Sequence, residues 1–246
     1  MMQNSQQQAY DRGITIFSPD GRLYQVEYAR EAVKRGSPSV GVRTHDGVVL
    51  LAGGRVRSSL QVPDSVEKIH KIDDHIGIAS AGHAADARQL VDFARRQAQV
   101  ERLRYEQPVT VESLTKEITD NIQQYTQTGG ARPFGVALLV GGVDENGTPR
   151  LFETDPSGTP YEWQAVAIGA DSEAIQKRLE EEYDEALSLD EGLDLALRAM
   201  AAENGGTGTL DPVGMSAARI DAETGAYEAL TREELASRIE ELGLLG

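Results

Sequence analysis

Residues 10–29 read YDRGITIFSPDGRLYQVEYA, a stretch in which an apolar segment is followed by a strong helix start. Serine is a favoured N-cap and proline a favoured first helical residue, so Ser18 and Pro19 predict that a helix begins at residue 19. Gly36 supplies the stop, because glycine readily ends a helix. Between these points, apolar residues recur at helical spacing: Leu23, Val26, Ala29 and Val33. We therefore expect a helix over residues 19–35.

On the C-terminal side of this helix, strands come in runs and helices in pairs. Hydrophobic alternation and turn residues predict strands over 40–44, 48–52, 67–72, 76–81, 135–143, 151–154, 161–168 and 213–220. Helical spacing predicts helices over 84–103, 111–127, 171–187 and 190–203, with a last helix opened by the capping box of Thr231 and Glu234. A doubly wound parallel sheet would need strict alternation of strand and helix. The order instead predicts an α+β protein with two antiparallel sheets packed face to face and helix pairs outside.

On the N-terminal side, about the first twelve residues are rich in Gln, Asn and Ser, and we expect a mobile tail there. No linker or internal repeat divides the rest of the chain. We therefore expect residues 1–36 to be an extension and residues 37–246 to form a single domain.

The composition excludes several classes of protein. The chain has no Cys, which rules out disulfide scaffolds, thiolate metal sites and cysteine nucleophiles. Its 40 Asp and Glu outnumber its 24 Lys and Arg, and the net charge of −16 makes nucleic acid and anionic membranes poor partners. The charge is uneven, because residues 171–246 carry 19 acidic and 6 basic side chains, whereas residues 1–35 carry 4 and 5.

Targeting and cofactor signals are absent from the sequence. The opening residues have no apolar signal region, and the longest apolar run, 134–143, is half of the roughly 20 residues that a spanning helix needs. We expect a cytoplasmic protein without cofactors. His70 and His75 would lie on opposite faces of a strand, which favours surface histidines over a metal site. The acidic run 180–185 lacks the spacing of a calcium loop and indicates a solvated helix face.

The opening stretch closely resembles the signature of α-type subunits of the 20S proteasome. Further stretches agree with this family, at residues 67–69, 84–88 and 124–135. The pattern looks like the archaeal type with a single α subunit, and the acidic excess resembles proteins of salt-loving archaea. The resemblance implies a four-layer αββα sandwich, the fold of N-terminal-nucleophile hydrolases, with an N-terminal helical extension. That fold agrees with the order of strands and helices.

The same resemblance implies that the chain has no catalytic residues of its own. Catalytic members of the fold need a threonine at a free N-terminus, because its amine acts as the base. Matching the chain to a catalytic subunit puts the internal Ser37 at that position and Gly53 at the position of the acidic residue. Only Lys68 matches a catalytic group.

The resemblance also implies a set of partners. Family α subunits form a seven-membered ring, of one α subunit or of a mixture, which stacks on a ring of β subunits and controls the access of unfolded proteins. An activating AAA+ ATPase docks its C-terminal tails between neighbouring α subunits. In this chain Lys68 would pair with the tail carboxylate, and Gly36 and Gly82 would let the tail backbone approach. His83 stands beside them, where an apolar residue is commoner. The alternative for Lys68 is an ordinary exposed lysine on a strand.

A gate and a pore rim are implied for other residues. The cluster that holds the N-terminal tails open corresponds to Tyr10, Asp11, Arg12, Pro19 and Tyr28, and packing of Tyr28 in the core is the alternative for that residue. The rim of the channel corresponds to Thr128, Gly129 and Gly130.

Two other functions compete with this interpretation. A self-processing hydrolase would be cleaved immediately before Ser37. A solitary adaptor would use its acidic C-terminal face to bind a basic partner.

Overall fold

The structure, a computed structural model, describes residues 17, 21, 23–54, 56, 58, 60–65, 67–127, 131–203 and 208–246. One five-stranded sheet, the first sheet, has the strand order β10-β9-β2-β1-β8. All of its neighbouring strands pair antiparallel. Its strands are β1 (Ser39–Thr44), β2 (Gly47–Ala52), β8 (Ala165–Ile168), β9 (Ser216–Asp221) and β10 (Tyr227–Ala229).

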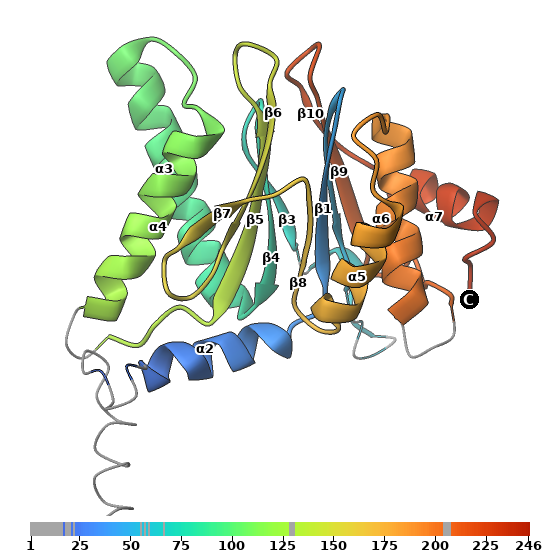
Figure 1. Cartoon of the computed structure of the whole chain (residues 1–246), viewed down its shortest axis with the longest axis horizontal. Coiled ribbons are helices and arrows are strands. Elements are labelled where there is room, and N and C mark those ends of the chain that lie inside the picture. The colour runs from blue at the N-terminus through green and yellow to red at the C-terminus, as the bar shows by residue number, and fades with distance from the viewer. Residues whose placement is uncertain are drawn as a thin grey trace, which may run out of the picture.

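The second sheet also has five antiparallel strands, in the order β3-β4-β5-β6-β7. The two sheets stack face to face (Figure 1). The strands of the second sheet are β3 (Ile69–Asp73), β4 (Ile76–Gly82), β5 (Val136–Val143), β6 (Pro149–Thr154) and β7 (Pro160–Glu162).

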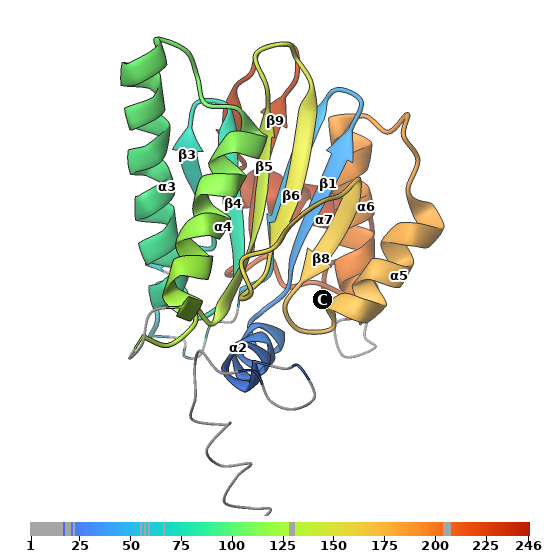
Figure 2. The ribbon, with the colours of Figure 1, turned by 60° about the vertical axis from the view of Figure 1, so that its left-hand side comes forward.

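Helices cover both outer faces, which completes the predicted αββα order (Figure 2). The second sheet is covered by α3 (Ala84–Tyr105) and α4 (Val111–Gln127). The first sheet is covered by α5 (Ser172–Glu182), α6 (Leu189–Glu203) and α7 (Arg232–Glu241), which opens with the predicted capping box. A short 3-10 turn spans Pro63–Ser65. Within the described ranges, no helix combines the length and the apolar character needed to cross a membrane.

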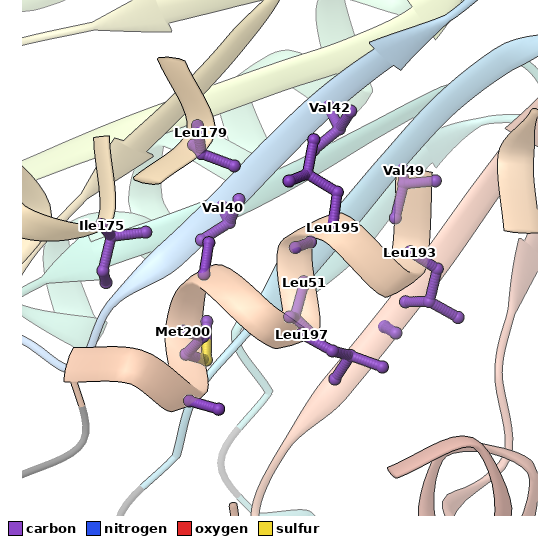
Figure 3. Close-up of a cluster of buried hydrophobic side chains, with 14 of the residues drawn as sticks. Val40, Val42, Val49, Leu51, Ile175, Leu179, Leu193, Leu195, Leu197 and Met200 are labelled. Carbon is purple, nitrogen blue, oxygen red and sulfur yellow. The ribbon is translucent and has the colours of Figure 1, made fainter. Parts of the chain in front are cut away.

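The core has three apolar layers, two beneath the helices and one between the sheets. In the layer under α5, α6 and α7, strand side chains such as Val40 and Leu51 meet Leu197 and Met200 of α6 (Figure 3). Alternate residues of β2, Val48 and Leu50, face the second sheet instead. Strand β2 is therefore buried on both faces, which explains its uninterrupted apolar run.

Helix α2 (Tyr24–Lys34) lies across one end of the sandwich (Figure 1). Its buried residues are Val26, Ala29 and Val33, and Val33 belongs to the layer between the sheets. The apolar spacing seen in the sequence therefore closes that end of the core.

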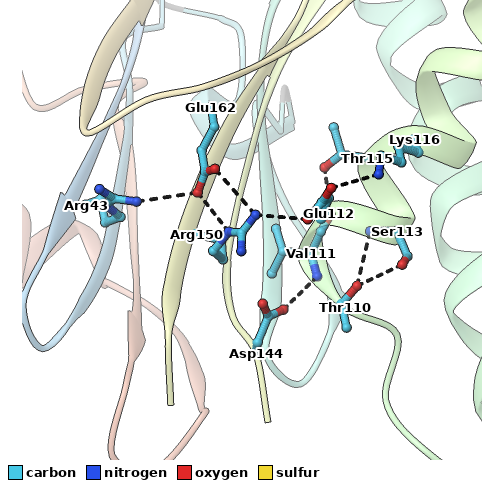
Figure 4. A network of polar contacts seen from close by, with 10 residues as sticks. All are labelled: Arg43, Thr110, Val111, Glu112, Ser113, Thr115, Lys116, Asp144, Arg150 and Glu162. Carbon is cyan, nitrogen blue, oxygen red and sulfur yellow. Dashed lines mark hydrogen bonds and ion pairs between the residues drawn. The ribbon is translucent and has the colours of Figure 1, made fainter. Parts of the chain in front are cut away.

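Elsewhere in the sandwich, a network of ion pairs connects the two sheets (Figure 4). Arg43 of β1 lies 3.4 Å from Glu162 of β7, which also pairs with Arg150 of β6 at 2.8 Å. Arg150 lies 3.1 Å from Glu112 of α4, and Glu112 in turn pairs with Lys116 at 2.7 Å. Because Arg43 belongs to the first sheet and the other members to the second sheet and its helix, the chain of ion pairs bridges the layers.

The start of α2 corrects a sequence prediction. The helix begins at Tyr24 instead of residue 19, and its N-cap is Leu23, whose backbone is extended and whose side chain makes no capping bond. Gly21 has a φ of +73°, a left-handed conformation that a right-handed helix does not contain. Ser18 and Pro19 lie outside the described residues.

Three further elements differ most from the predictions. The single strand predicted over 161–168 is two strands, because β7 pairs with β6 in the second sheet and β8 with β1 in the first. Helix α5 ends at Glu182 instead of residue 187, since Tyr183 has extended backbone. Strand β10, only three residues long, was not predicted.

The prediction of surface histidines was wrong for His70 and His75. They are only 9% and 8% exposed. His75 lies at the tip between β3 and β4, where its Nε2 is 2.8 Å from the carbonyl oxygen of Val109 in the α3–α4 loop. The loop covers the ring and supplies the hydrogen-bonding partner that a buried imidazole needs. Among the residues described, no group of three or more His, Asp or Glu could hold a metal ion.

The layer between the sheets gives a test of the fold. Leu139 of β5 is fully buried there, so Leu139→Ala should lower the free energy of unfolding by about 3 kcal/mol through the lost burial and the cavity left behind. Leu103→Ala, on a side chain that is 84% exposed, should change it by less than about 0.5 kcal/mol. Denaturant unfolding at one fixed salt concentration measures both, and equal effects would contradict the described packing.

Candidate functional site

A cavity of about 1530 Å³ opens beside α2, at the end of the sandwich that this helix covers. Four predicted site residues from separate parts of the chain line it together: Gly36, Lys68, Gly82 and His83. Tyr28 of α2 also lines the cavity, and its side chain is 52% exposed. The alternative in which Tyr28 packs in the core is therefore wrong.

The side chain of Lys68 points inward and joins the two ends of the β1–β2 hairpin. Its Nζ donates hydrogen bonds to the carbonyl oxygens of Ser37 at 2.7 Å and Gly53 at 2.9 Å, and lies 3.4 Å from that of Pro38. Ser37 and Pro38 lead into β1, and Gly53 follows β2. Lys68 is therefore not the ordinary exposed lysine that the alternative interpretation required.

Two opposing effects act on the charge of this amine. Burial lowers the pKa of Lys68 from 10.5 to about 7, because an ammonium loses hydration there. The carbonyl oxygens that accept its hydrogen bonds stabilise the protonated form. A carboxylate that reached the cavity would add to the second effect and favour the ammonium.

Gly36 and Gly82 are required by the packing of the chain on itself. A Cβ atom on Gly36 would clash with the backbone of Gly82. Gly82 has a φ of +117°, and a Cβ atom there would clash with the carbonyl oxygen of Gly135. These close approaches bring the end of α2, the end of β4 and the start of β5 together at the cavity wall.

His83 is the N-cap of α3 and continues this wall. Its backbone N–H donates to the carbonyl oxygen of Gly135 at 2.9 Å, and its side chain makes no capping bond. The residue is exposed, and the next two residues, Ala84 and Ala85, also line the cavity. The first turn of α3 and the glycine backbone therefore form part of the cavity lining. Lys68 and other charged side chains also line it, among them Glu31, Arg35 and Glu67.

Ser37 and Gly53 were singled out in the sequence for other reasons, and their carbonyl contacts with Lys68 were not foreseen. Ser37 follows Gly36 in an unbroken chain, so its nitrogen is an amide and not a basic amine. Hydrogen bonds to backbone carbonyls leave no trace in residue type, so no sequence signal indicated these contacts.

The remaining predicted residues lie outside the described part of the chain. These are the gate residues Tyr10, Asp11, Arg12 and Pro19 and the rim residues Thr128, Gly129 and Gly130.

Comparisons with known proteins agree along the whole chain. The sequence pattern of proteasome subunits matches residues 33–205, and the N-terminal signature of A-type proteasome subunits matches residues 10–32. Proteasome subunit alpha 2 of Haloarcula marismortui is 67% identical over 245 residues, which cover 100% of this chain and 99% of the relative. Proteasome subunit alpha of Haloquadratum walsbyi is 66% identical over 239 residues, 97% of this chain and 94% of the relative.

With these matches, the four-layer sandwich is identified as the fold of N-terminal-nucleophile hydrolases. The two patterns adjoin without a gap and together cover residues 10–205, and the similarity to the relatives continues to the end of the chain. The chain belongs to the proteasome α-subunit family.

The environment of Lys68 predicts an unusual titration. In the folded protein, acylation of Lys68 by an amine reagent should reach half of its maximal rate near pH 7, because the neutral amine is the reactive form and burial lowers the pKa to about 7. In denaturant, the same lysine should titrate near 10.5. Mass spectrometry of labelled peptides measures both, and a folded-state midpoint near pH 10 would mean that the carbonyl contacts outweigh burial.

Proposed function

We propose that the chain is a non-catalytic subunit of an α ring that controls access to the proteolytic chamber of a 20S proteasome and docks an activating ATPase. The ring would contain seven copies of this chain, or a mixture with another α subunit, stacked on a ring of β subunits. Unfolded proteins would be the substrates of the assembled particle. Membership of the α-subunit family supports the ring and its β partner.

The cavity at Lys68 is the observation that carries the docking proposal. A chain-terminal carboxylate is a planar anion that a partly desolvated ammonium binds strongly. Lys68 supplies such an ammonium, and the cavity of about 1530 Å³ has room for the end of an extended peptide. These features fit the C-terminal tail of an AAA+ ATPase that ends in a hydrophobic residue, Tyr and any residue.

The proposal that the chain is not itself a protease depends on the residues around Ser37. A nucleophile of this fold type needs the free amine of its own residue as the base. Ser37 has an amide nitrogen within the intact chain, and Gly53 has no side chain with which to act as an acid. Lys68 is the remaining matched group, and it bonds to backbone carbonyls.

Residues 1–36 are proposed as a gate tail followed by the extension helix, and residues 37–246 as the sandwich domain. Tyr10, Asp11, Arg12, Pro19 and Tyr28 would hold the tails in the open state, and Thr128, Gly129 and Gly130 would form the rim. Tyr28 supports this assignment, because its exposed ring lies on the helix that lines the docking cavity. A docked tail would therefore contact the helix that follows the gate segment, which is a direct route from docking to opening.

The ring is tested by expressing the chain alone and together with a proteasome β subunit, in molar salt. Negative-stain images should show seven-fold rings, and the coexpressed particle should hydrolyse short peptides. The intact mass of the chain should show no cleavage before Ser37. A stable monomer under both conditions would contradict the proposal, and cleavage before Ser37 would favour the self-processing hydrolase.

Docking is tested with Lys68→Ala in the assembled particle. The variant should lose the stimulation of peptide hydrolysis by a synthetic activator tail with a free C-terminus, because the ammonium that binds the carboxylate is gone. For the unaltered particle, stimulation should weaken as the pH rises through 7, since burial lowers the pKa of Lys68 to about 7 and the charged form is then lost.

Lys71→Ala is the matched control for this substitution. Lys71 lies on β3, which begins directly after Lys68, and it is exposed and pairs with Asp74 at 2.8 Å, so its removal should leave stimulation unchanged. A tail with an amidated C-terminus should be inactive on the unaltered particle. Full stimulation of the Lys68→Ala particle would refute the assignment of the cavity.

A further inference from the structure

Asp86 is a buried carboxylate that none of the functions above uses. It lies in the first turn of α3, and its side chain is only 8% exposed. Arg132 forms a bidentate ion pair with this carboxylate: Nη1 donates to Oδ2 at 2.6 Å and Nη2 donates to Oδ1 at 2.8 Å. The backbone N–H of Gly135 donates to the same Oδ2 at 2.8 Å. Asp86 therefore binds the segment that leads into β5 to the first turn of α3.

Gly135 is the point at which this contact meets the cavity wall. Its carbonyl oxygen accepts a hydrogen bond from the backbone N–H of His83. This bond attaches Gly135 to the segment 82–85, which lines the cavity between β4 and α3. A Cβ atom on Gly135 would lie 3.0 Å from the His83 ring and 3.4 Å from Ala32 of α2. Both Ala32 and His83 line the cavity, whereas Asp86 and Arg132 are not among its lining residues. Gly135 therefore lies against two parts of the cavity lining, and it is hydrogen-bonded to one of them.

The electrostatics favour an ionised carboxylate at Asp86. Burial raises the pKa of Asp86, but the hydrogen bonds from Arg132 and Gly135 outweigh it and hold the pKa below its usual value. The carboxylate therefore stays ionised at neutral pH. Its charge also lies near the N-terminus of α3, where the helix dipole stabilises an anion.

We propose that Asp86 and Arg132 are a positioning pair for the docking cavity. They hold Gly135, and through it His83 and Gly82, in the arrangement that receives a chain end with a free carboxylate. A site that is already in its bound arrangement loses less entropy when the ligand arrives. This inference rests on the proposed docking function and adds to it a pair of residues that do not touch the ligand.

The competing explanation is that the pair only stabilises the fold. The chain offers a control in Arg238 of α7 and Asp194 of α6, which also form a bidentate contact, here through Nε at 2.6 Å and Nη2 at 2.8 Å. Asp194 is also mostly buried, with 14% of its side chain exposed. This control pair lies in the helical layer over the first sheet, and neither of its residues lines the cavity.

The experiment compares Asp86→Asn with Asp194→Asn in the assembled particle. For Asp86→Asn, the tail peptide concentration that gives half-maximal stimulation should rise roughly five- to twentyfold, while the maximal stimulated rate stays the same. Asp194→Asn should lower the melting temperature by a similar amount and leave the half-maximal concentration unchanged. Arg132→Lys keeps the positive charge but cannot form the bidentate ion pair. This variant should still assemble, and its half-maximal peptide concentration should rise by an intermediate amount.

Three outcomes would overturn the inference. The first is an unchanged half-maximal concentration for both Asp86→Asn and Arg132→Lys. The second is an equal rise for Asp194→Asn, which would assign the effect to stability alone. The third is the absence of any response by the unaltered particle to the tail peptide, and that result would refute the docking function itself.

Discussion

The apolar contact between the two sheets is the constraint on which the other features depend. Strand β2 is buried on both faces, so the first sheet cannot exist without a helical layer on one side and the second sheet on the other. Such a stack leaves the inter-sheet layer open at its ends. Helix α2 covers one end with Val33, and the cavity lies beside this helix.

The elements that could be predicted from the sequence are those with strong and uninterrupted periodicity. The α4 boundaries agree with the prediction, and α3 extends only two residues further than expected. In a long amphipathic helix, single residues that break the apolar spacing have little effect on the overall pattern. The start of α2 depended on the capping preference of Ser18 and Pro19, and the backbone of Gly21 and Leu23 opposes that preference. Over residues 161–168, alternation indicated extended chain, but it carries no information on which sheet a strand joins.

Only part of the site could be predicted from the sequence. The resemblance to α subunits indicated Lys68, Gly36, Gly82 and His83, and the structure brings all four to one cavity. Residue spacing alone would not have shown that these four residues lie together, since the cavity joins segments that are far apart in the chain. The contact between Asp86 and Arg132 was missed for the same reason, because these residues are 46 positions apart. The predicted tail and rim fall outside the described residues.

The three carbonyl groups around Lys68 also determine when its hydration is lost. Part of the water that would surround an exposed lysine has here been replaced during folding, because the carbonyl oxygens of Ser37, Pro38 and Gly53 lie within 3.4 Å of the ammonium. An incoming carboxylate would exchange one acceptor for another, with the weakest contact, that to Pro38, as the first to yield. Association at this lysine would then be an exchange of hydrogen-bond acceptors on an ammonium that folding has already partly desolvated.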